Sequence, residues 1–270
     1  MHKWLLIVGV MLILTGCIKK QFLGDEEKQI AFEDYFDGFE GSFIMLDEQT
    51  NDYLIYNEEL IETQVSPCST FKILNALIGL ETGVIQDANH MYKWDGTTYN
   101  MEAWNGDHTL ASAIKYSVVW YYKRLAKEVG LSQMQHYMDL VKYGNGDISG
   151  GLTEFWIMSS LKISPREQVD LLRDLYQDKL PFTSDNMAIV RDILVLEDTE
   201  DYTLSGKTGS GRTGKDEELI GWFVGTVQRE GHRHHFAVFI QGKNDTSGYK
   251  AKDIARQILK DLDLINALEE

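Results

Sequence analysis

The hydrophobic pattern separates a helical middle from two strand-rich ends. Over residues 64–199 apolar side chains recur mainly at helical spacing, whereas both ends show strand patterns. Strands are expected at residues 42–47, 53–56, 202–208, 219–228 and 235–241. A last amphipathic helix is expected from about residue 250 to 264. This order predicts an α/β (α+β) fold, with a central antiparallel β-sheet built from both chain ends, flanking helices and an all-helical lobe.

The helical middle contains one segment that is apolar almost all round, from Ile73 to Leu80. Such a helix belongs in the interior of a domain. Ser66 fits its N-cap, Pro67 its first helical position and Gly83 its end. We therefore expect a capped, buried helix at the centre of the fold.

Other helices and two long loops fill the rest of the middle. Residues 110–129 form one periodic stretch, residues 132–141 form a second that begins with a cap, and Ser164–Glu167 has the capping-box pattern at the start of a third. Residues 87–106 and 143–160 are rich in Gly, Asn and Trp and are expected to be surface loops. Loops of this length are more often functional than idle.

The first 32 residues are expected to serve export and tethering. Residues 1–16 place a lysine before a short apolar core, the pattern of a signal peptide. Leu14–Cys17 resembles the bacterial lipobox, in which the cysteine becomes the lipidated first residue of a lipoprotein. The alternative is a plain secretory signal with a chance cysteine. Residues 17–32 would be a polar tether and residues 33–270 the folded domain, with a sheet lobe at 33–63 and 200–270 and a helical lobe at 64–199.

Composition and charge limit the partners. A chain of 270 residues with 43% hydrophobic content can bury a full core. Its net charge of -16 argues against nucleic acid and against an anionic membrane surface, because both attract basic patches. Membrane contact is therefore expected through the lipid anchor only. The protein would be exported and held on the extracytoplasmic side of the cell membrane, or partly released from it.

The chain has two cysteines, Cys17 and Cys68. If Cys17 is lipidated, Cys68 is the one remaining thiol and no intramolecular disulfide forms. We expect Cys68 to be a small buried residue rather than a reactive thiol.

Ser69 and Lys72 are the first candidates for chemistry. They lie three residues apart at the start of the apolar helix, so they share one face. Burial of an ammonium without a partner is costly and favours the neutral amine, which is a general base beside a hydroxyl. The alternative is an ordinary Ser and Lys on a helix surface. The same spacing begins at three other serines, none of which opens a capped, buried helix: Ser112, Ser159 and Ser247.

Two later motifs offer partners. Lys207, Thr208 and Gly209 end a predicted strand and provide a charge, a hydroxyl and close backbone access for a substrate carboxylate, although a plain β-turn has the same residues. Ser117 lies within the 110–129 stretch, where the ordinary expectation is a hydroxyl bonded to a carbonyl one turn back.

Together these motifs identify a family. Sets of this kind occur in penicillin-recognising serine enzymes. The chain resembles a class D β-lactamase (oxacillinase type), over about residues 35–265. The resemblance is carried by the following segments: Pro67–Lys72, Asn75–Gly83, Ser117–Val119, Tyr143–Asn145, Phe155–Trp156 and Lys207–Gly209.

The resemblance implies a serine β-lactam hydrolase. Ser69 would be acylated by a β-lactam antibiotic, and Lys72 would be carbamylated by carbon dioxide or bicarbonate, with no separate cofactor and no metal. The carbamate would take the Ser69 proton and later activate the deacylating water. Trp156, Val119 and Ile157 would surround the carbamate.

The resemblance also assigns the remaining roles. Ser117 would pass a proton to the departing ring nitrogen. The backbone N–H groups of Ser69 and Ser210 would form the oxyanion hole. The substrate-binding residues would be Lys207, Thr208, Gly209, Ser210 and Tyr143.

Two positions depart from the family pattern. Family members usually carry an arginine near the last helix that pairs with the substrate carboxylate, and here Lys250 or Lys252 would replace it. A lysine lacks the bidentate fork of arginine. Trp120 also follows the Ser-x-Val motif where a proline is common.

Two further groups of residues have ordinary explanations. His232, His234 and His235 are expected at the exposed tip of a hairpin, without a carboxylate partner and without a metal. The loop side chains that either rim a cleft or pack the helical lobe are Trp94, Tyr99, Met101 and Trp104.

Two rival functions remain. A β-lactam-binding sensor or penicillin-binding peptidase-like domain would acylate without efficient deacylation. A catalytically silent cell-wall lipoprotein would only bind. The sequence leaves open the preference among penicillins, cephalosporins and carbapenems, the catalytic rate, the oligomeric state and the type of host envelope.

Overall fold

The computed structural model describes residues 30–212 and 218–266. The expected signal peptide at 1–16, Cys17 and residues 17–29 of the expected tether lie outside these residues. The helices are α1 (Phe32–Tyr35), α2 (Glu58–Glu62), α3 (Lys72–Glu81), α4 (Leu110–Lys115), α5 (Val119–Val129), α6 (Leu131–Val141), α7 (Pro165–Tyr176), α8 (Ser184–Ile193) and α9 (Gly248–Asp261), with 3-10 helices η1 (Cys68–Phe71) and η2 (Glu102–Trp104). The strands are β1 (Glu40–Asp47), β2 (Tyr53–Tyr56), β3 (Met91–Tyr92), β4 (His108–Thr109), β5 (Val195–Asp198), β6 (Tyr202–Arg212), β7 (Leu219–Arg229) and β8 (His232–Gly242).

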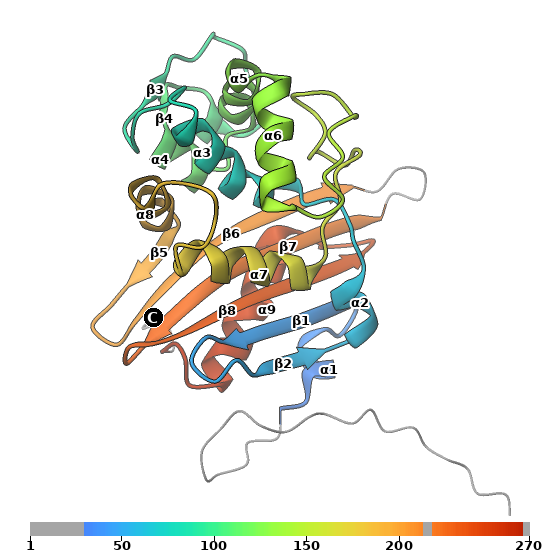
Figure 1. The fold of residues 1–270 in the computed structure, drawn as a ribbon. Helices are drawn as coiled ribbons and strands as arrows, with labels where there is room; N and C mark the ends of the chain where they lie inside the picture. Colours follow the sequence, from blue (N-terminus) through green and yellow to red (C-terminus); the bar gives the residue numbers. More distant parts are fainter. Residues whose placement is uncertain (1–29, 213–217, 267–270) are drawn as a thin grey trace, which may run out of the picture.

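Both ends of the chain contribute to one six-stranded antiparallel sheet in the order β2-β1-β8-β7-β6-β5 (Figure 1). The β1–β2 and β7–β8 hairpins form where the strand patterns predict them. Glu230 and Gly231 connect β7 to β8 with φ angles of 52° and 81°. This is the left-handed pair that a two-residue hairpin turn requires. The predicted central sheet is confirmed.

Alternate side chains of the sheet enter two separate cores, because successive strand residues point to opposite faces. Ile44 and Phe239 pack with α7 and the helical lobe, whereas Phe43 and Val238 pack with α9. Figure 1 shows α7 in front of the sheet and α9 behind it. The sheet is therefore covered on both faces, with the helical lobe at one end.

The α3 helix lies at the centre of the helical lobe, and every residue from Lys72 to Leu80 is buried. It packs against α5 and α8. Gly79 allows the approach of α5, since an added Cβ there would lie 2.7 Å from Leu125 Cδ1. The predicted buried helix is confirmed. Within residues 30–212 and 218–266, no helix has both the length and the apolar character needed to cross a membrane.

The helical middle differs from the prediction at three points. The stretch at 110–129 is two helices, α4 and α5, because Ser117 has a φ of 56° that a helix cannot contain. The α6 helix has Gly130 as its N-cap and no side-chain cap from Ser132. The short strand β5 lies within the predicted helical lobe and forms one edge of the sheet.

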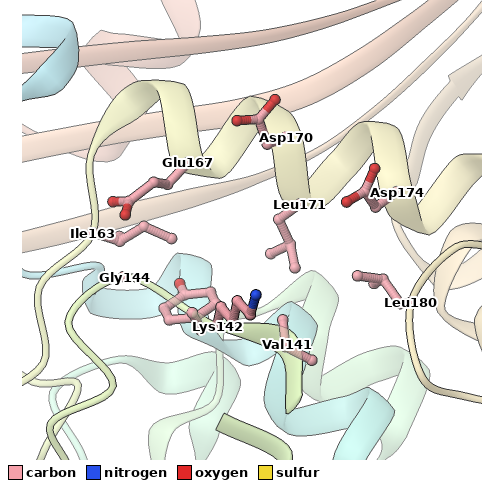
Figure 2. A pocket seen from close by; sticks show the side chains of 10 residues that line it. Val141, Lys142, Gly144, Ile163, Glu167, Asp170, Leu171, Asp174 and Leu180 are labelled. Atoms are coloured by element: carbon pink, nitrogen blue, oxygen red, sulfur yellow. The ribbon is translucent and has the colours of Figure 1, made fainter. Parts of the chain in front are cut away.

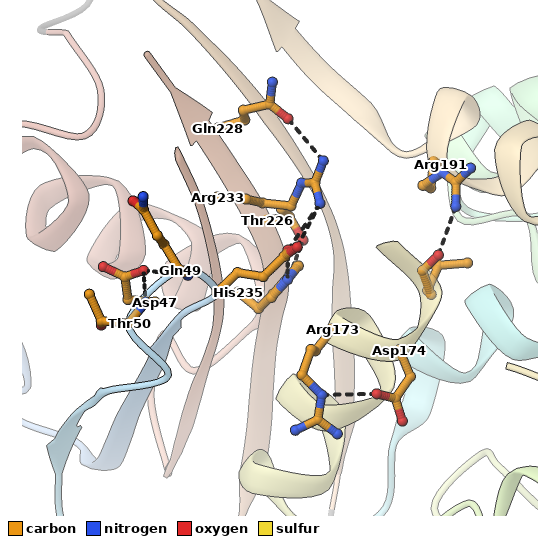
Figure 3. Close-up of polar contacts among 12 residues, drawn as sticks. Asp47, Gln49, Thr50, Arg173, Asp174, Arg191, Thr226, Gln228, Arg233 and His235 are labelled. Carbon is orange, nitrogen blue, oxygen red and sulfur yellow. Dashed lines mark hydrogen bonds and ion pairs between the residues drawn. The ribbon is translucent and has the colours of Figure 1, made fainter. Parts of the chain in front are cut away.

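The histidines near the β7–β8 turn do not form an exposed tip. His232 is exposed, but His234 and His235 are 8% and 0% exposed. His235 Nε2 lies 2.8 Å from Glu48 Oε2, and its Nδ1 lies 2.9 Å from Thr226 Oγ1 (Figure 3). A neutral ring that donates from Nε2 and accepts at Nδ1 satisfies both contacts. The prediction that these histidines lack a carboxylate partner is wrong, because the β1–β8 pairing brings Glu48 from far away in the sequence. In the described part of the chain, no three His, Cys, Asp or Glu side chains are grouped to hold a metal ion.

The buried His235 predicts acid sensitivity. Burial lowers its pKa from 6.5 to about 4. Between these two values the unfolded chain binds a proton that the folded chain does not, so the free energy of unfolding falls as the pH falls. At 1.36 kcal/mol per pKa unit, the full loss is about 3 kcal/mol. His235→Gln should flatten this pH dependence in urea unfolding measured from pH 7.5 to 4.5.

The exposed His136 in α6 provides the control. His136→Gln should keep the wild-type pH dependence. If His235→Gln and the wild type show equal slopes, folding does not lower the pKa of His235.

Candidate active site

The turn that carries Ser69 begins differently from the prediction. The chain enters α3 through the 3-10 turn η1, and Cys68 has a φ of 50°. Ser66 is not the N-cap. Its hydroxyl donates to the Trp156 carbonyl oxygen at 3.2 Å and accepts from the Met158 N–H at 3.0 Å. Because the Ser66 hydroxyl is engaged by another segment and Cys68 is left-handed, the helix starts only after Cys68.

Lys72 contacts both candidate hydroxyls. Its Nζ lies 2.9 Å from Ser69 Oγ, 2.9 Å from Ser117 Oγ and 2.7 Å from the Ser117 carbonyl oxygen. The Lys72 side chain is fully buried, and the Tyr122 ring centroid lies 5.6 Å from its Nζ. The structure therefore brings Ser69, Lys72 and Ser117 into direct contact.

The surroundings of Lys72 favour the neutral amine. Burial, and then the charge of Lys207, hold the pKa of Lys72 well below its usual value. The Ser117 carbonyl oxygen can only accept, so it takes one N–H of Lys72. A neutral amine has a second N–H for the Ser117 hydroxyl and a lone pair that accepts the Ser69 proton. This is the arrangement of a nucleophile and its general base.

Ser117 reaches Lys72 because the chain breaks its helix there. The Ser117 N–H donates to the Ile114 carbonyl and the Val118 N–H to the Ala113 carbonyl, which closes α4 in a tight turn. This turn presents both the carbonyl oxygen and the hydroxyl of Ser117 to Lys72. The ordinary interpretation of Ser117, as a mid-helix serine bonded one turn back, is wrong.

The strand β6 passes directly beside the Ser69 turn. An added Cβ on Gly209 would lie 3.0 Å from the Pro67 carbonyl oxygen and 3.3 Å from Thr70 Cγ2. A side chain at position 209 would therefore push the strand away from Ser69. The absence of a side chain allows this close approach.

The outer edge of β6 is open next to Ser69. The short strand β5 covers it as far as Gly206, whose N–H donates to the Leu194 carbonyl. Backbone N–H groups alternate along a strand, so those of Thr208 and Ser210 point to the same edge beyond β5. In residues 30–212 and 218–266 no strand pairs with this part of the edge. The Ser210 hydroxyl accepts from the Gly248 N–H at 2.8 Å, which joins this part of β6 to the start of α9.

Lys207 lies on the same face of β6 as Gly209 and is 4% exposed. Its Nζ donates to the Thr208 carbonyl oxygen at 3.0 Å and lies 3.4 Å from Thr208 Oγ1. Burial lowers the pKa of Lys207 to about 7. Within residues 30–212 and 218–266 no carboxylate pairs with Lys207, and its protonated form beside the open strand edge is suited to bind an anionic group.

Comparisons with known proteins agree with this geometry. Residues 41–260 match the penicillin binding protein transpeptidase domain. The chain is 39% identical to the probable beta-lactamase YbxI of Bacillus subtilis, over 99% of this chain and 100% of that protein. A crystal structure of a class D beta-lactamase from Bacillus subtilis matches with a TM-score of 0.83 and 40% identity, over 88% of this chain and 98% of that one. The chain belongs to the class D β-lactamase family. It is also similar to the C-terminal domain of the Bacillus licheniformis BlaR penicillin-receptor, with a TM-score of 0.82 and 35% identity over 87% of this chain and 96% of that one.

The three residues that the resemblance places around the carbamate come from two segments. Trp156 is buried and its ring stacks on Phe71 at a centroid distance of 5.4 Å. Ile157 follows it and packs against the main core. Val119 begins α5, two residues after Ser117. Trp156 therefore contacts the residue that precedes Lys72, and Val119 lies close in sequence to Ser117, which contacts Lys72.

Tyr143 occupies a different place from the one that the resemblance implies. It is 2% exposed, and its ring packs edge-on against Phe71 at 5.6 Å. It also lines a separate cavity of about 150 Å³ beside α7, which Figure 2 shows with Lys142 and Glu167 in its wall. Direct contact with a substrate is not supported for Tyr143. Its position is that of a support beneath the Ser69 turn.

The two lysines of α9 are placed differently from each other. Lys250 Nζ lies 5.5 Å from the Phe39 ring, next to β1 and three strands away from the open edge of β6. Lys252 follows Gly248 by four residues and shares its helix face. Gly248 packs against Thr208 and Gly209. The prediction for Lys250 is therefore wrong in position, and Lys252 remains the candidate cation.

Sequence reasoning missed a buried polar chain behind Ser69. Gln168 Nε2 donates to Thr70 Oγ1 at 2.6 Å, and Thr70 Oγ1 donates to the Pro67 carbonyl oxygen at 2.8 Å. Gln168 and Thr70 are both 0% exposed. The available signal was the position of Gln168 on α7, where it shares the apolar face of Leu172 and Leu175.

The loop aromatics are shown in the packing role, one of the two that the sequence leaves open. Trp104 Nε1 donates to the Tyr116 carbonyl oxygen at 3.0 Å, and Trp120 Nε1 donates to the Trp104 carbonyl oxygen at 2.9 Å. Met101 and Tyr116 are 46% and 44% exposed. The indoles fix the loop onto the segment that carries Ser117, while Met101 and Tyr116 remain at the surface.

The ionisation of Lys72 can be tested through stability. Between the lowered pKa of the folded Lys72 and the ordinary lysine pKa of 10.5, the unfolded chain binds a proton that the folded amine lacks, so the wild-type free energy of unfolding should rise with pH over this range. Lys72→Met removes the free-energy cost of releasing this proton on folding. Its stability relative to the wild type should be greatest near pH 7 and decline by pH 10, in guanidinium unfolding under carbon dioxide-free buffer.

The control is Lys93→Met, which alters an exposed lysine. It should show no such decline. A Lys72→Met effect that stays constant with pH would mean that the folded Lys72 is charged.

Proposed function

We propose that the chain hydrolyses β-lactam antibiotics through acylation of Ser69 and deacylation by water. The observation that carries this proposal is the buried Lys72 amine in contact with the hydroxyls of Ser69 and Ser117. Family membership supports it, since YbxI and the matched Bacillus subtilis structure are named as β-lactamases.

In the acylation step Ser69 Oγ attacks the carbonyl carbon of the four-membered ring. The Ser69 proton passes to the base at Lys72, and the bond between the carbonyl carbon and the ring nitrogen breaks. Ser117, which touches Lys72 Nζ, gives its hydroxyl proton to that nitrogen and takes up the proton held at Lys72. The product is an ester of Ser69 and a secondary amine.

The base at Lys72 is proposed to include a carbamate. The residues fit this group, because a buried amine with a strongly lowered pKa has the lone pair that adds to carbon dioxide, with release of one proton. Trp156, Val119 and Ile157 would hold it. When bound, the carbamate supplies a carboxylate-like base for the Ser69 proton and for the deacylating water.

Substrate binding is proposed at the open edge of β6. Lys207 and Thr208 would hold the substrate carboxylate, with Gly209 giving close access and Lys252 as the second cation. The N–H of Ser210, which points to the open edge, would form the oxyanion hole with the N–H of Ser69.

A chromogenic cephalosporin tests the proposal. With added bicarbonate, the purified domain should turn it over continuously, and removal of bicarbonate should slow turnover. A single stoichiometric burst would instead indicate a penicillin-receptor domain or a peptidase-like domain that stays acylated. No reaction would indicate a protein that only binds.

Lys72→Ala tests the identity of the base. Deacylation should be lost because no other described group touches Ser69 Oγ as a base. Stopped-flow measurements should show turnover reduced by about a thousandfold, which lies within the contribution of general-base catalysis (about 10²–10⁴-fold). Intact-mass measurements should show that any acyl-enzyme that forms persists. Lys93→Ala is the matched surface control. Steady turnover by Lys72→Ala would contradict the assignment.

We further propose that residues 1–16 are a lipoprotein signal peptide and that Cys17 is lipidated after export. The domain would then be tethered to the extracytoplasmic side of the cell membrane. Cys17→Ser should move the protein from the membrane fraction to the soluble fraction and abolish labelling by a clickable fatty acid. A variant that remains in the membrane fraction would contradict the lipid anchor.

A further inference from the structure

Ser66 joins the nucleophile turn to the segment that follows Trp156. The Ser66 hydroxyl donates to the Trp156 carbonyl oxygen at 3.2 Å, and Ser66 Oγ also accepts from the Met158 N–H at 3.0 Å. One hydroxyl therefore holds both ends of a three-residue segment. Ser66 is 1% exposed, so water does not replace these bonds.

A sulfur contact reinforces the same junction. Cys68 Sγ lies 3.4 Å from Met158 Sδ and 3.8 Å from Ser66 Oγ. Burial raises the pKa of the Cys68 thiol to about 11, so it stays protonated, as the sequence predicts for a small buried cysteine. Gly211 of β6 packs against both sulfur atoms, since an added Cβ there would lie 2.3 Å from Met158 Sδ and 2.6 Å from Cys68 Sγ.

The backbone at this junction is strained. Cys68 and Met158 both have positive φ angles, of 50° and 49°. Such conformations are unfavourable for residues with a side chain and persist only where the surroundings impose them. The Ser66 bonds and the sulfur contact link these two residues directly.

Ser66 is itself fixed to the sheet. Its carbonyl oxygen accepts from Trp222 Nε1 at 2.9 Å, and Trp222 is a fully buried residue of β7. The sheet therefore sets the position of Ser66, and Ser66 sets the position of the Trp156–Met158 segment. Phe71, next to Lys72, stacks on Trp156 from the other side.

We propose that Ser66, assisted by the Cys68–Met158 contact, is a positioning residue that holds Trp156 and Ile157 around Lys72 and so sets the affinity of Lys72 for carbon dioxide. This inference rests on the proposed function. It assigns a role to the residue before Pro67, which touches neither Lys72 nor the substrate edge in the contacts described above. The effect is transmitted through the backbone of residues 156–158.

Ser66→Ala is the direct test. Titration of the resting protein with ¹³C-labelled bicarbonate, followed by the carbamate signal in ¹³C NMR, measures carbon dioxide binding without turnover. Loss of the hydroxyl should raise the half-saturating bicarbonate concentration about tenfold, the size expected for one or two lost hydrogen bonds. The bicarbonate dependence of cephalosporin turnover should shift by the same factor. Lys72→Ala identifies the signal, which it should abolish.

Ser42→Ala is the matched control. Ser42 is also a buried serine, and its hydroxyl has no hydrogen-bond partner among the residues that the structure describes. It lies on β1 and should leave the half-saturating bicarbonate concentration within twofold of the wild type. Thermal unfolding of both variants separates a loss of stability from a loss of carbon dioxide binding.

A second variant covers the case in which Ser66→Ala does not fold. Met158→Leu removes the sulfur contact and keeps the Ser66 hydroxyl, and it should raise the half-saturating concentration about threefold. If the folded variants bind bicarbonate as the wild type does, the inference is wrong. If the wild type itself gives no carbamate signal and no bicarbonate dependence, the proposed function of Lys72 is wrong instead.

Discussion

The arrangement of this protein depends on the burial of the Lys72 amine without a counter-charge. Its three contacts are the two hydroxyls of Ser69 and Ser117 and the Ser117 carbonyl oxygen, none of which is anionic. Burial of an unpaired ammonium is too costly, so the amine loses its proton. The apolar α3 helix around Lys72 therefore does more than fill the core. It sets the ionisation state on which the chemistry depends, and Lys207 on β6 acts in the same direction.

Backbone strain accompanies the burial of the Lys72 amine. Cys68, Ser117 and Met158 have positive φ angles. Cys68 precedes Ser69, Ser117 contacts Lys72, and the Met158 N–H donates to Ser66. Each position re-aims a group that a regular helix or loop would direct elsewhere: the Ser69 side chain, the Ser117 carbonyl and the Trp156 segment. Strain of this kind requires rigid surroundings. They are supplied by the buried α3 helix and by Trp222 of the sheet, which holds Ser66.

The sequence predicted the features that depend on local spacing. The Ser69–Lys72 pair follows from helix geometry, and the β1–β2 and β7–β8 hairpins follow from alternation. It could not predict the break at Ser117, because a serine with positive φ has no local signature. Ser66 before Pro67 has the same pattern as an N-cap, although its partners lie 90 residues away. The Glu48–His235 pair depends on strand register between the two ends of the chain, which a local pattern does not contain.

The similarity to both β-lactamases and a penicillin receptor has a physical explanation. Acylation needs a nucleophile, a base and a proton donor, and Ser69, Lys72 and Ser117 meet these needs in one cluster. Hydrolysis makes one further demand, that the base at Lys72 still functions after Ser69 has become an ester. Because Ser69 then no longer holds Lys72 through its hydroxyl, that property depends on the other walls of the site. Ser117 is one of those walls, since its carbonyl oxygen and hydroxyl both contact Lys72. On the proposed function, the difference between a hydrolase and a receptor on this fold is expected at residues that position the base after acylation, the role that we proposed for Ser66, rather than in the motifs themselves.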